Sequence, residues 1–163
     1  MLILILGSLS LLLLVLLFKP ASMTQTQEDE KEDFTAPKTA TKLDLSAQGL
    51  QKLPEYVVSQ TNLEELDISS NNISGALPAE IRHLQNLKIL NASNNQMTGV
   101  PAEVGQLRNL EVLDLSNNQL TGLPYELGNL KNLKVLDLSG NNYAEQDLET
   151  IKEALPASTQ IVL

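Results

Sequence analysis

Leucines recur along the chain with a spacing that fits neither an amphipathic helix nor a simple alternating strand. Between residues 110 and 124 the sequence reads LEVLDLSNNQLTGLP, with leucines at 110, 113, 115, 120 and 123. The same pattern starts again at Leu63, Leu87 and Leu133, and a weaker copy starts at Ala40. Successive copies therefore begin 23, 24, 23 and 23 residues apart. A fixed period of this length predicts a solenoid, in which each repeat packs only against its neighbours.

Within each copy the segment L-x-x-L-x-L predicts one short strand. Leucines two positions apart lie on the same face of an extended chain, so Leu113 and Leu115 are expected to point inward. Val112, Asp114 and Ser116 then point outward. Strands from successive repeats, stacked in parallel, predict a sheet with one strand per repeat.

The segments between strands must return the chain to the start of the next strand. They carry apolar pairs that are expected to reach the same core from the opposite side: Ile81 and Leu84, Val104 and Leu107, Leu127 and Leu130. An asparagine also occupies one register at the end of each strand, at positions 71, 95, 118 and 141. An amide there can pair backbone groups that the turning chain would otherwise bury without a partner, which predicts an internal hydrogen-bonded ladder.

The last residues leave the 23-residue period. In residues 144–163, Leu148, Ile151 and Leu155 follow at helical spacing, Pro156 ends the pattern, and Ile161 to Leu163 reads as a short strand. Because the last repeat of a solenoid exposes a cross-section of its core, this helix and strand are predicted to form a cap.

The pattern L-x-x-L-x-L-x-x-N-x-L-x-x-L-P resembles the leucine-rich repeat over residues 40–163. Its 23-residue period ending in LP is similar to Ras-group and bacterial repeats, and the 24-residue copy with SGALPAEI is similar to plant-type repeats. The resemblance implies an α/β solenoid of five repeats, with a short parallel sheet on the concave side and short helices or turns on the convex side. The first copy departs from the pattern at Ala40 and Gln48, which suggests a worn N-terminal cap.

The N-terminal quarter of the chain, residues 1–39, has a different character. Residues 1–18 carry no charge and are followed by Lys19. This uncharged run is longer than a signal-peptide core and shorter than a usual membrane-spanning helix. We expect residues 1–19 to be a retained single-pass signal anchor, with a cleaved signal peptide and a secreted product as the alternative. No Lys or Arg precedes the run, so orientation stays open; an extracytoplasmic repeat domain is favoured. Residues 20–39, with the charge run EDEKED, predict an acidic flexible linker.

Composition removes several classes of function. A formal net charge of −9 and 3% aromatic residues argue against nucleic-acid binding, which needs clustered Lys and Arg and stacking side chains. There is no cysteine, hence no disulfide and no thiolate metal site or nucleophile. The single histidine, His83, is predicted on the convex side, away from the serines that follow the strands.

The resemblance places function on the concave face, whose outward rows can be written from the register. The residues expected to contact a partner are Glu65, Asp67, Ile89, Asn91, Val112, Asp114, Val135 and Asp137. Aspartates on neighbouring strands repel one another unless a basic group intervenes, so the expected partner is a protein, with basic character. The alternative interpretation is that this row is a generic soluble surface, because LDLS is a common sequence in the family.

No cofactor, metal ion or catalytic activity is expected. A one-residue-per-strand row of carboxylates offers too few converging oxygens for calcium, and an open sheet has no pocket to shift a pKa. The first hypothesis is therefore a membrane-tethered module that binds protein through its concave face. The second is a structural or adhesive surface scaffold with weak multivalent binding.

Overall fold

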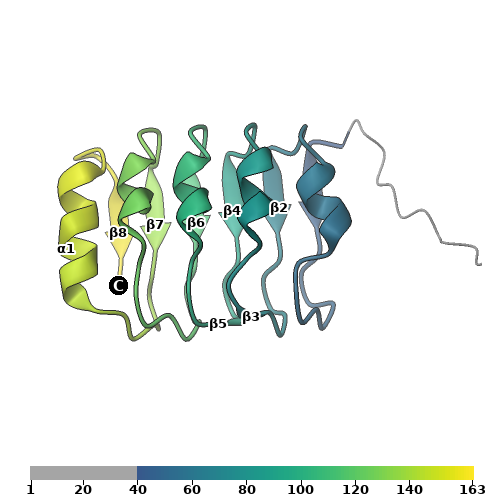
Figure 1. The fold of residues 1–163 in the computed structure, drawn as a ribbon, viewed down its shortest axis with the longest axis horizontal. Helices are drawn as coiled ribbons and strands as arrows, with labels where there is room; N and C mark the ends of the chain where they lie inside the picture. The colour runs from purple at the N-terminus through teal and green to yellow at the C-terminus, as the bar shows by residue number, and fades with distance from the viewer. Residues whose placement is uncertain (1–39) are drawn as a thin grey trace, which may run out of the picture. The chain divides into compact units, whose positions relative to one another are not determined.

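The computed structural model describes residues 40–163, and within them a six-stranded parallel sheet forms one wall of a solenoid (Figure 1). The strand order is β1-β2-β4-β6-β7-β8, which follows the sequence apart from the two strands of a smaller sheet. The strands are β1 Lys42–Asp44, β2 Glu65–Asp67, β4 Ile89–Asn91, β6 Val112–Asp114, β7 Val135–Asp137 and β8 Gln160–Val162. The predicted sheet of one strand per repeat is confirmed.

The strands pair in the register that the repeats predicted. Leu66 pairs with Leu90, Leu90 with Leu113, and Leu113 with Leu136. All four of these side chains are fully buried. The leucines therefore form one continuous line inside the solenoid, and the repeat period determines the architecture.

Four 3-10 helices cover the other side of the core in the described part of the chain. They are η1 Glu55–Ser59, η2 Ala79–His83, η3 Ala102–Gln106 and η4 Tyr125–Asn129, and Figure 1 shows them in front of the sheet. A proline precedes each one, with φ between −61° and −71°, because the pyrrolidine ring fixes a φ suited to helix entry. The apolar pairs predicted on this side are all buried, so the short convex helices and their inward face are confirmed.

The second sheet was not expected from the sequence. Strands β3 (Ser74–Gly75) and β5 (Gln96–Met97) pair in parallel, shortly after the ladder asparagines of the second and third repeats. Met97 N–H also donates to the side chain of Asn118 at 3.0 Å. This short sheet adds backbone pairing where the chain leaves the concave wall.

The predicted asparagine ladder is present. Each of Asn71, Asn95, Asn118 and Asn141 donates from Nδ2 to carbonyl oxygens of its own repeat and of the preceding one. Each Oδ1 accepts a backbone N–H from the preceding repeat at 3.0 Å. The ladder therefore joins successive turns of the chain through groups that lie next to the core.

A left-handed backbone residue precedes each ladder position. Ser70, Asn94 and Asn117 have φ between 52° and 57°, Gly140 has φ 69°, and Ala47 in the first repeat has φ 55°. This conformation turns the chain out of the strand so that the next side chain points into the core. The turn is therefore the same in all five repeats even though glycine occupies it only once.

A helix and a strand follow the last repeat. Helix α1 (Glu145–Ala154) buries Leu148 and Ile151, and β8 pairs with β7 as the last strand of the sheet. Lys131 Nζ donates to the carbonyl oxygens of Gly128 and Ala154 at 2.8 and 2.5 Å, which joins the end of α1 to η4. The predicted strand began at Ile161, one residue later than observed.

The expectations for residues 1–19 and 20–39 fall outside the described residues. Over residues 40–163, no helix combines the length and the apolar character needed to cross a bilayer.

Candidate protein-binding face

The outward side chains of β2, β4, β6 and β7 form parallel rows on the concave face. Pairing sets Glu65 beside Ile89, Ile89 beside Val112, and Val112 beside Val135. Three successive strands thus present a branched aliphatic side chain on one row, spaced by about 4.8 Å. These three aliphatic side chains are half-buried. We call Ile89, Val112 and Val135 the apolar strip.

The next row carries acidic side chains held by local hydrogen bonds. One carboxylate oxygen of Asp114 accepts the N–H of Ser116 at 2.9 Å, and Asp137 accepts the N–H of Ser139 at 3.0 Å. Hydrogen bonds from the side chain and the backbone N–H of Ser46 lower the pKa of Asp44. These aspartates therefore stabilise the end of each strand as well as lying on the surface, as expected for the LDLS motif.

The second oxygen distinguishes the members of this row. Asn91 Nδ2 donates to Asp67 Oδ2 at 3.0 Å, so both oxygens of Asp67 have partners. The hydrogen bonds of Asp114 and Asp137 within residues 40–163 involve only Oδ1. Beside the apolar strip, the oxygens left to accept from a partner are therefore the second oxygens of Asp114 and Asp137. Asp44, which also bonds only to Ser46, lies on β1 away from the strip.

Ion pairs line the other side of the apolar strip. Glu64 pairs with Lys88 at 2.7 Å, and Glu111 pairs with Lys134 at 2.6 Å. The hydrogen bond to Glu64 raises the pKa of Lys88, and the bond from Lys134 lowers the pKa of Glu111. Both pairs are solvent-exposed, so they contribute more to the charge pattern of the face than to stability.

Glu65, one of the predicted contact residues, has a partner on the neighbouring strand. Lys42 Nζ lies 2.5 Å from Glu65 Oε2, and this hydrogen bond raises the pKa of Lys42. The charge of Glu65 is therefore compensated within the chain. Within residues 40–163, Asp114 and Asp137 are the carboxylates beside the apolar strip that have no ion-pair partner.

The serine row is less open than the register suggested. Ser93 and Ser116 are only 5% and 7% exposed, because the chain turns back at the residue that follows each of them. The Ser93 hydroxyl donates to Asn91 Oδ1 at 2.8 Å. This row therefore supports the turn rather than offering hydroxyls to a partner.

Two further findings concern chemistry. His83 lies exposed on η2, across the core from these serines, as predicted. Among residues 40–163, no three carboxylate or imidazole side chains are grouped so that they could hold a metal ion.

A second row of asparagines escaped sequence reasoning. Asn86, Asn109 and Asn132 donate from Nδ2 to carbonyl oxygens of the preceding repeat at 2.8 to 2.9 Å. The signal was present, because each stands directly before the first leucine of a repeat as Q-N-L, R-N-L or K-N-L. These exposed amides fix the entrance of the strand, as the ladder fixes its exit.

Comparison with known families gives a match to the leucine-rich repeat region over residues 41–158. The chain belongs to the leucine-rich repeat family. A leucine-rich repeat protein of Leptospira interrogans is 41% identical, with a TM-score of 0.65 over 69% of this chain and 28% of that chain. A comparison with curated protein sequences gives no match.

Plant leucine-rich repeat receptors are also similar. The peptide hormone receptor RGFR1, solved in complex with RGF2, is 36% identical, with a TM-score of 0.61 over 76% of this chain and 22% of that chain. The ectodomain of the Arabidopsis thaliana receptor kinase GASSHO1/SCHENGEN3, in complex with CASPARIAN STRIP INTEGRITY FACTOR 2, is 34% identical, with a TM-score of 0.58 over 69% of this chain and 14% of that chain. This leucine-rich repeat chain therefore spans less than a third of the length of these three relatives.

Proposed function

We propose that this leucine-rich repeat chain binds a protein partner through the C-terminal half of its concave face. The observation that carries the proposal is the apolar strip beside the second carboxylate oxygens of Asp114 and Asp137. Aliphatic side chains of a partner would cover the strip, and water would leave it on binding. The family supports this proposal, because leucine-rich repeat domains are typically interaction scaffolds.

The partner is expected to carry a lysine or an arginine. Asp114 and Asp137 lie on paired strands, so their carboxylates are neighbours. A planar guanidinium can bridge two such oxygens, and a charge-assisted hydrogen bond is stronger than a neutral one. RGFR1 is a peptide hormone receptor solved with RGF2, and GASSHO1/SCHENGEN3 was solved with CASPARIAN STRIP INTEGRITY FACTOR 2, which supports a peptide or an exposed protein segment as the partner class.

The binding proposal is tested with residues 38–163 immobilised as bait, followed by identification of what it retains. Val112→Glu places a charge in the apolar strip, and Asp114→Lys reverses the charge beside it. Each should weaken capture of the retained protein about tenfold, a size typical of a contact near the centre of an interface. Glu153→Lys, an exposed change on α1, is the matched control and should leave capture unchanged.

Val112→Glu and Asp114→Lys also distinguish this function from the structural or adhesive alternative. A partner retained equally by wild type, Val112→Glu and Asp114→Lys would contradict recognition by the concave face. Multivalent attachment of cells that persists in both variants would instead favour the structural or adhesive role.

Membrane attachment through residues 1–19 is part of the same proposal, with the repeats on the extracytoplasmic side. Attachment is supported by the uncharged run of 18 residues. Fractionation of cells that express the whole chain, or the chain without residues 1–19, tests it. The whole chain should sediment with membranes and the shortened chain should not; equal solubility of the two would refute attachment.

A further inference from the structure

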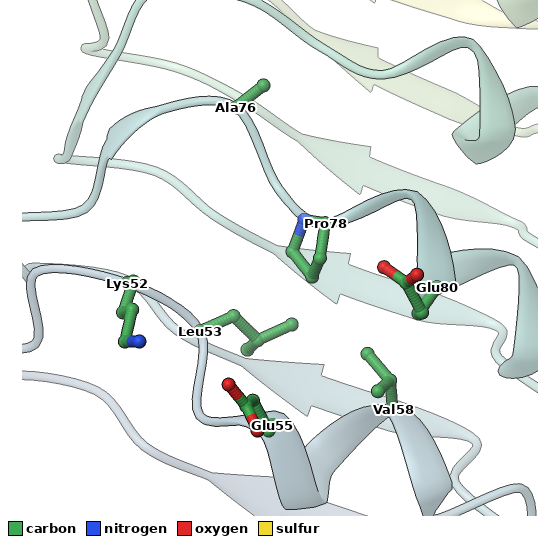
Figure 2. A pocket seen from close by; sticks show the side chains of 7 residues that line it. All are labelled: Lys52, Leu53, Glu55, Val58, Ala76, Pro78 and Glu80. Atoms are coloured by element: carbon green, nitrogen blue, oxygen red, sulfur yellow. The ribbon is translucent and has the colours of Figure 1, made fainter.

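A hollow lies on the convex side of the solenoid, between the segments that lead into η1 and η2 (Figure 2). Its volume is about 540 Å³. Lys52, Leu53, Glu55 and Val58 line it from the first repeat, and Ala76, Pro78 and Glu80 line it from the second. We call this hollow the η1–η2 groove. It is formed by residues that the concave face does not use.

Two departures from the repeat meet at the η1–η2 groove. Val58 occupies the helix position where the third and fourth repeats have Gly105 and Gly128. A Cβ atom at Gly105 would lie 2.1 Å from the Glu126 carbonyl oxygen, so those later helices pack closely only because a side chain is missing. The first two repeats carry side chains in that position, Val58 and Arg82, and the Val58 side chain lines the hollow between η1 and η2.

The second departure is the extra residue of the 24-residue repeat. Pro78 follows the ladder residue Asn71 by seven positions, whereas Pro101 follows Asn95 by six. The additional residue lengthens the loop that contains Ala76, which is exposed at the rim of the groove.

A hollow at the corresponding place between the third and fourth repeats is lined by Val100, Pro124 and Glu126, but Gly105 stands there in place of Val58. The side chains of Val58 and Glu55 therefore distinguish the η1–η2 groove.

The lining has a definite chemistry. Leu53 is almost fully buried beneath the groove, and Val58 and Pro78 are half-buried at its sides. Glu55 and Glu80 are exposed on opposite sides of the hollow; Glu80 lies next to Val58, and Glu55 lies between Lys52 and Val58 (Figure 2). Neither glutamate forms an ion pair within residues 40–163. The end near Val58 is therefore apolar below and acidic at both rims.

We propose that the η1–η2 groove is a second docking site, for a protein segment that inserts an aliphatic side chain followed by an arginine or a lysine. The aliphatic side chain covers Leu53, Val58 and Pro78. The basic side chain lies between Glu55 and Glu80, where two carboxylates face one positive charge. This site is on the opposite side of the core from the concave face, and it does not rest on the function proposed for that face.

Photo-crosslinking of the whole chain in mild detergent tests the site directly. The probe is the peptide acetyl-Gly-photoleucine-Arg-Gly-amide, and its matched partner has Glu in place of Arg. After irradiation, mass spectrometry should locate adducts of the basic probe on residues 52–58 and 76–80. The acidic probe should label these segments about fivefold less, because its carboxylate meets two others of the same charge.

Two pairs of variants separate groove binding from general attraction to an acidic protein. Glu80→Lys should lower labelling by the basic probe about fivefold. Glu126→Lys makes the same change of charge at the equivalent position of the fourth repeat, and labelling should not change. Ala76→Arg places a side chain at the rim and should reduce labelling by about tenfold, whereas Gly99→Arg, at the equivalent position with open space around it, should not.

The outcomes distinguish this site from the concave one. Adducts spread evenly over the repeats, equal labelling by both probes, or an equal effect of Glu80→Lys and Glu126→Lys would each overturn the proposal. Asp114→Lys should leave groove labelling unchanged. If it instead abolishes labelling and adducts map to β6 and β7, the probe binds the concave face and the groove is not a separate site.

Discussion

The ladder makes a quantitative prediction at its centre, Asn118. Its Oδ1 accepts the Met97 N–H at 3.0 Å. Its Nδ2 donates at 3.0 to 3.2 Å to three carbonyl oxygens, those of Ala92, Leu115 and Ser116. Asn118 is 7% exposed and Met97 is fully buried, so water cannot easily replace the amide. Asn118→Ala removes all four bonds at once.

The cost follows from which groups lose their only partner. Each of the three carbonyl oxygens keeps another donor, namely Asn95 Nδ2, Asn141 Nδ2 and Asn94 N–H. The Met97 N–H is left buried without a partner, which costs about 1–3 kcal/mol. The lost bonds to the carbonyl oxygens add a smaller amount, because those oxygens remain paired. We expect the free energy of unfolding to fall by about 3 kcal/mol.

Urea denaturation of residues 38–163, followed by far-UV circular dichroism, measures this loss. Gln119→Ala is the control, since Gln119 is the exposed neighbour of Asn118 and should change the unfolding free energy by less than about 0.5 kcal/mol. A loss below about 1 kcal/mol for Asn118→Ala would refute the reasoning, because the ladder would then be an incidental feature of the turn. A broadened transition would show instead that the repeats unfold separately on either side of the gap.

Three more predictions concern packing and charge. Gly105→Ala should destabilise the fold by about 1–3 kcal/mol, because its Cβ would meet a backbone carbonyl at 2.1 Å, whereas Gly99→Ala should be nearly neutral in the same urea assay. Leu113→Ala, at a fully buried site, should cost about 2–5 kcal/mol by thermal or urea unfolding. The hydrogen bond from Lys134 lowers the pKa of Glu111 in the folded state. The stability that the ionised Glu111 contributes is therefore present above its unfolded pKa and is lost as the pH falls through its folded pKa. Glu111→Gln should make the urea midpoint decline less between about pH 6 and about pH 3.

The inward residues of the fold were predictable because their spacing is imposed by geometry. A strand exposes alternate side chains on one face, so Leu113 and Leu115 could be placed in the core and Val112 on the surface without coordinates. The ladder could be predicted for a similar reason, because a turn that buries backbone groups needs an amide at one register. The C-terminal helix and strand followed from Leu148 and Ile151 at helical spacing.

The state of the surface groups could not be predicted in the same way. The row of aspartates was predicted, but not that Asn91 donates to the second oxygen of Asp67, which leaves Asp114 and Asp137 as the acceptors beside the apolar strip. Which oxygen a side chain uses depends on rotamers and on neighbours one repeat away. The η1–η2 groove was not predicted because it depends on side chains, such as Val58, that differ from repeat to repeat. Such differences leave no periodic signal in the sequence.

Each strand of the sheet meets its neighbour in the same alignment, and this makes the length of the wall an adjustable property. A tandem duplication of 23 codons, covering residues 102–124, would insert one helix, one strand and one ladder amide whose neighbours on both sides are already suitable. Each such copying event would extend the binding face by about 4.8 Å and leave both ends unaltered. Duplication of one repeat can therefore lengthen the concave face for a longer partner without any other change to the core.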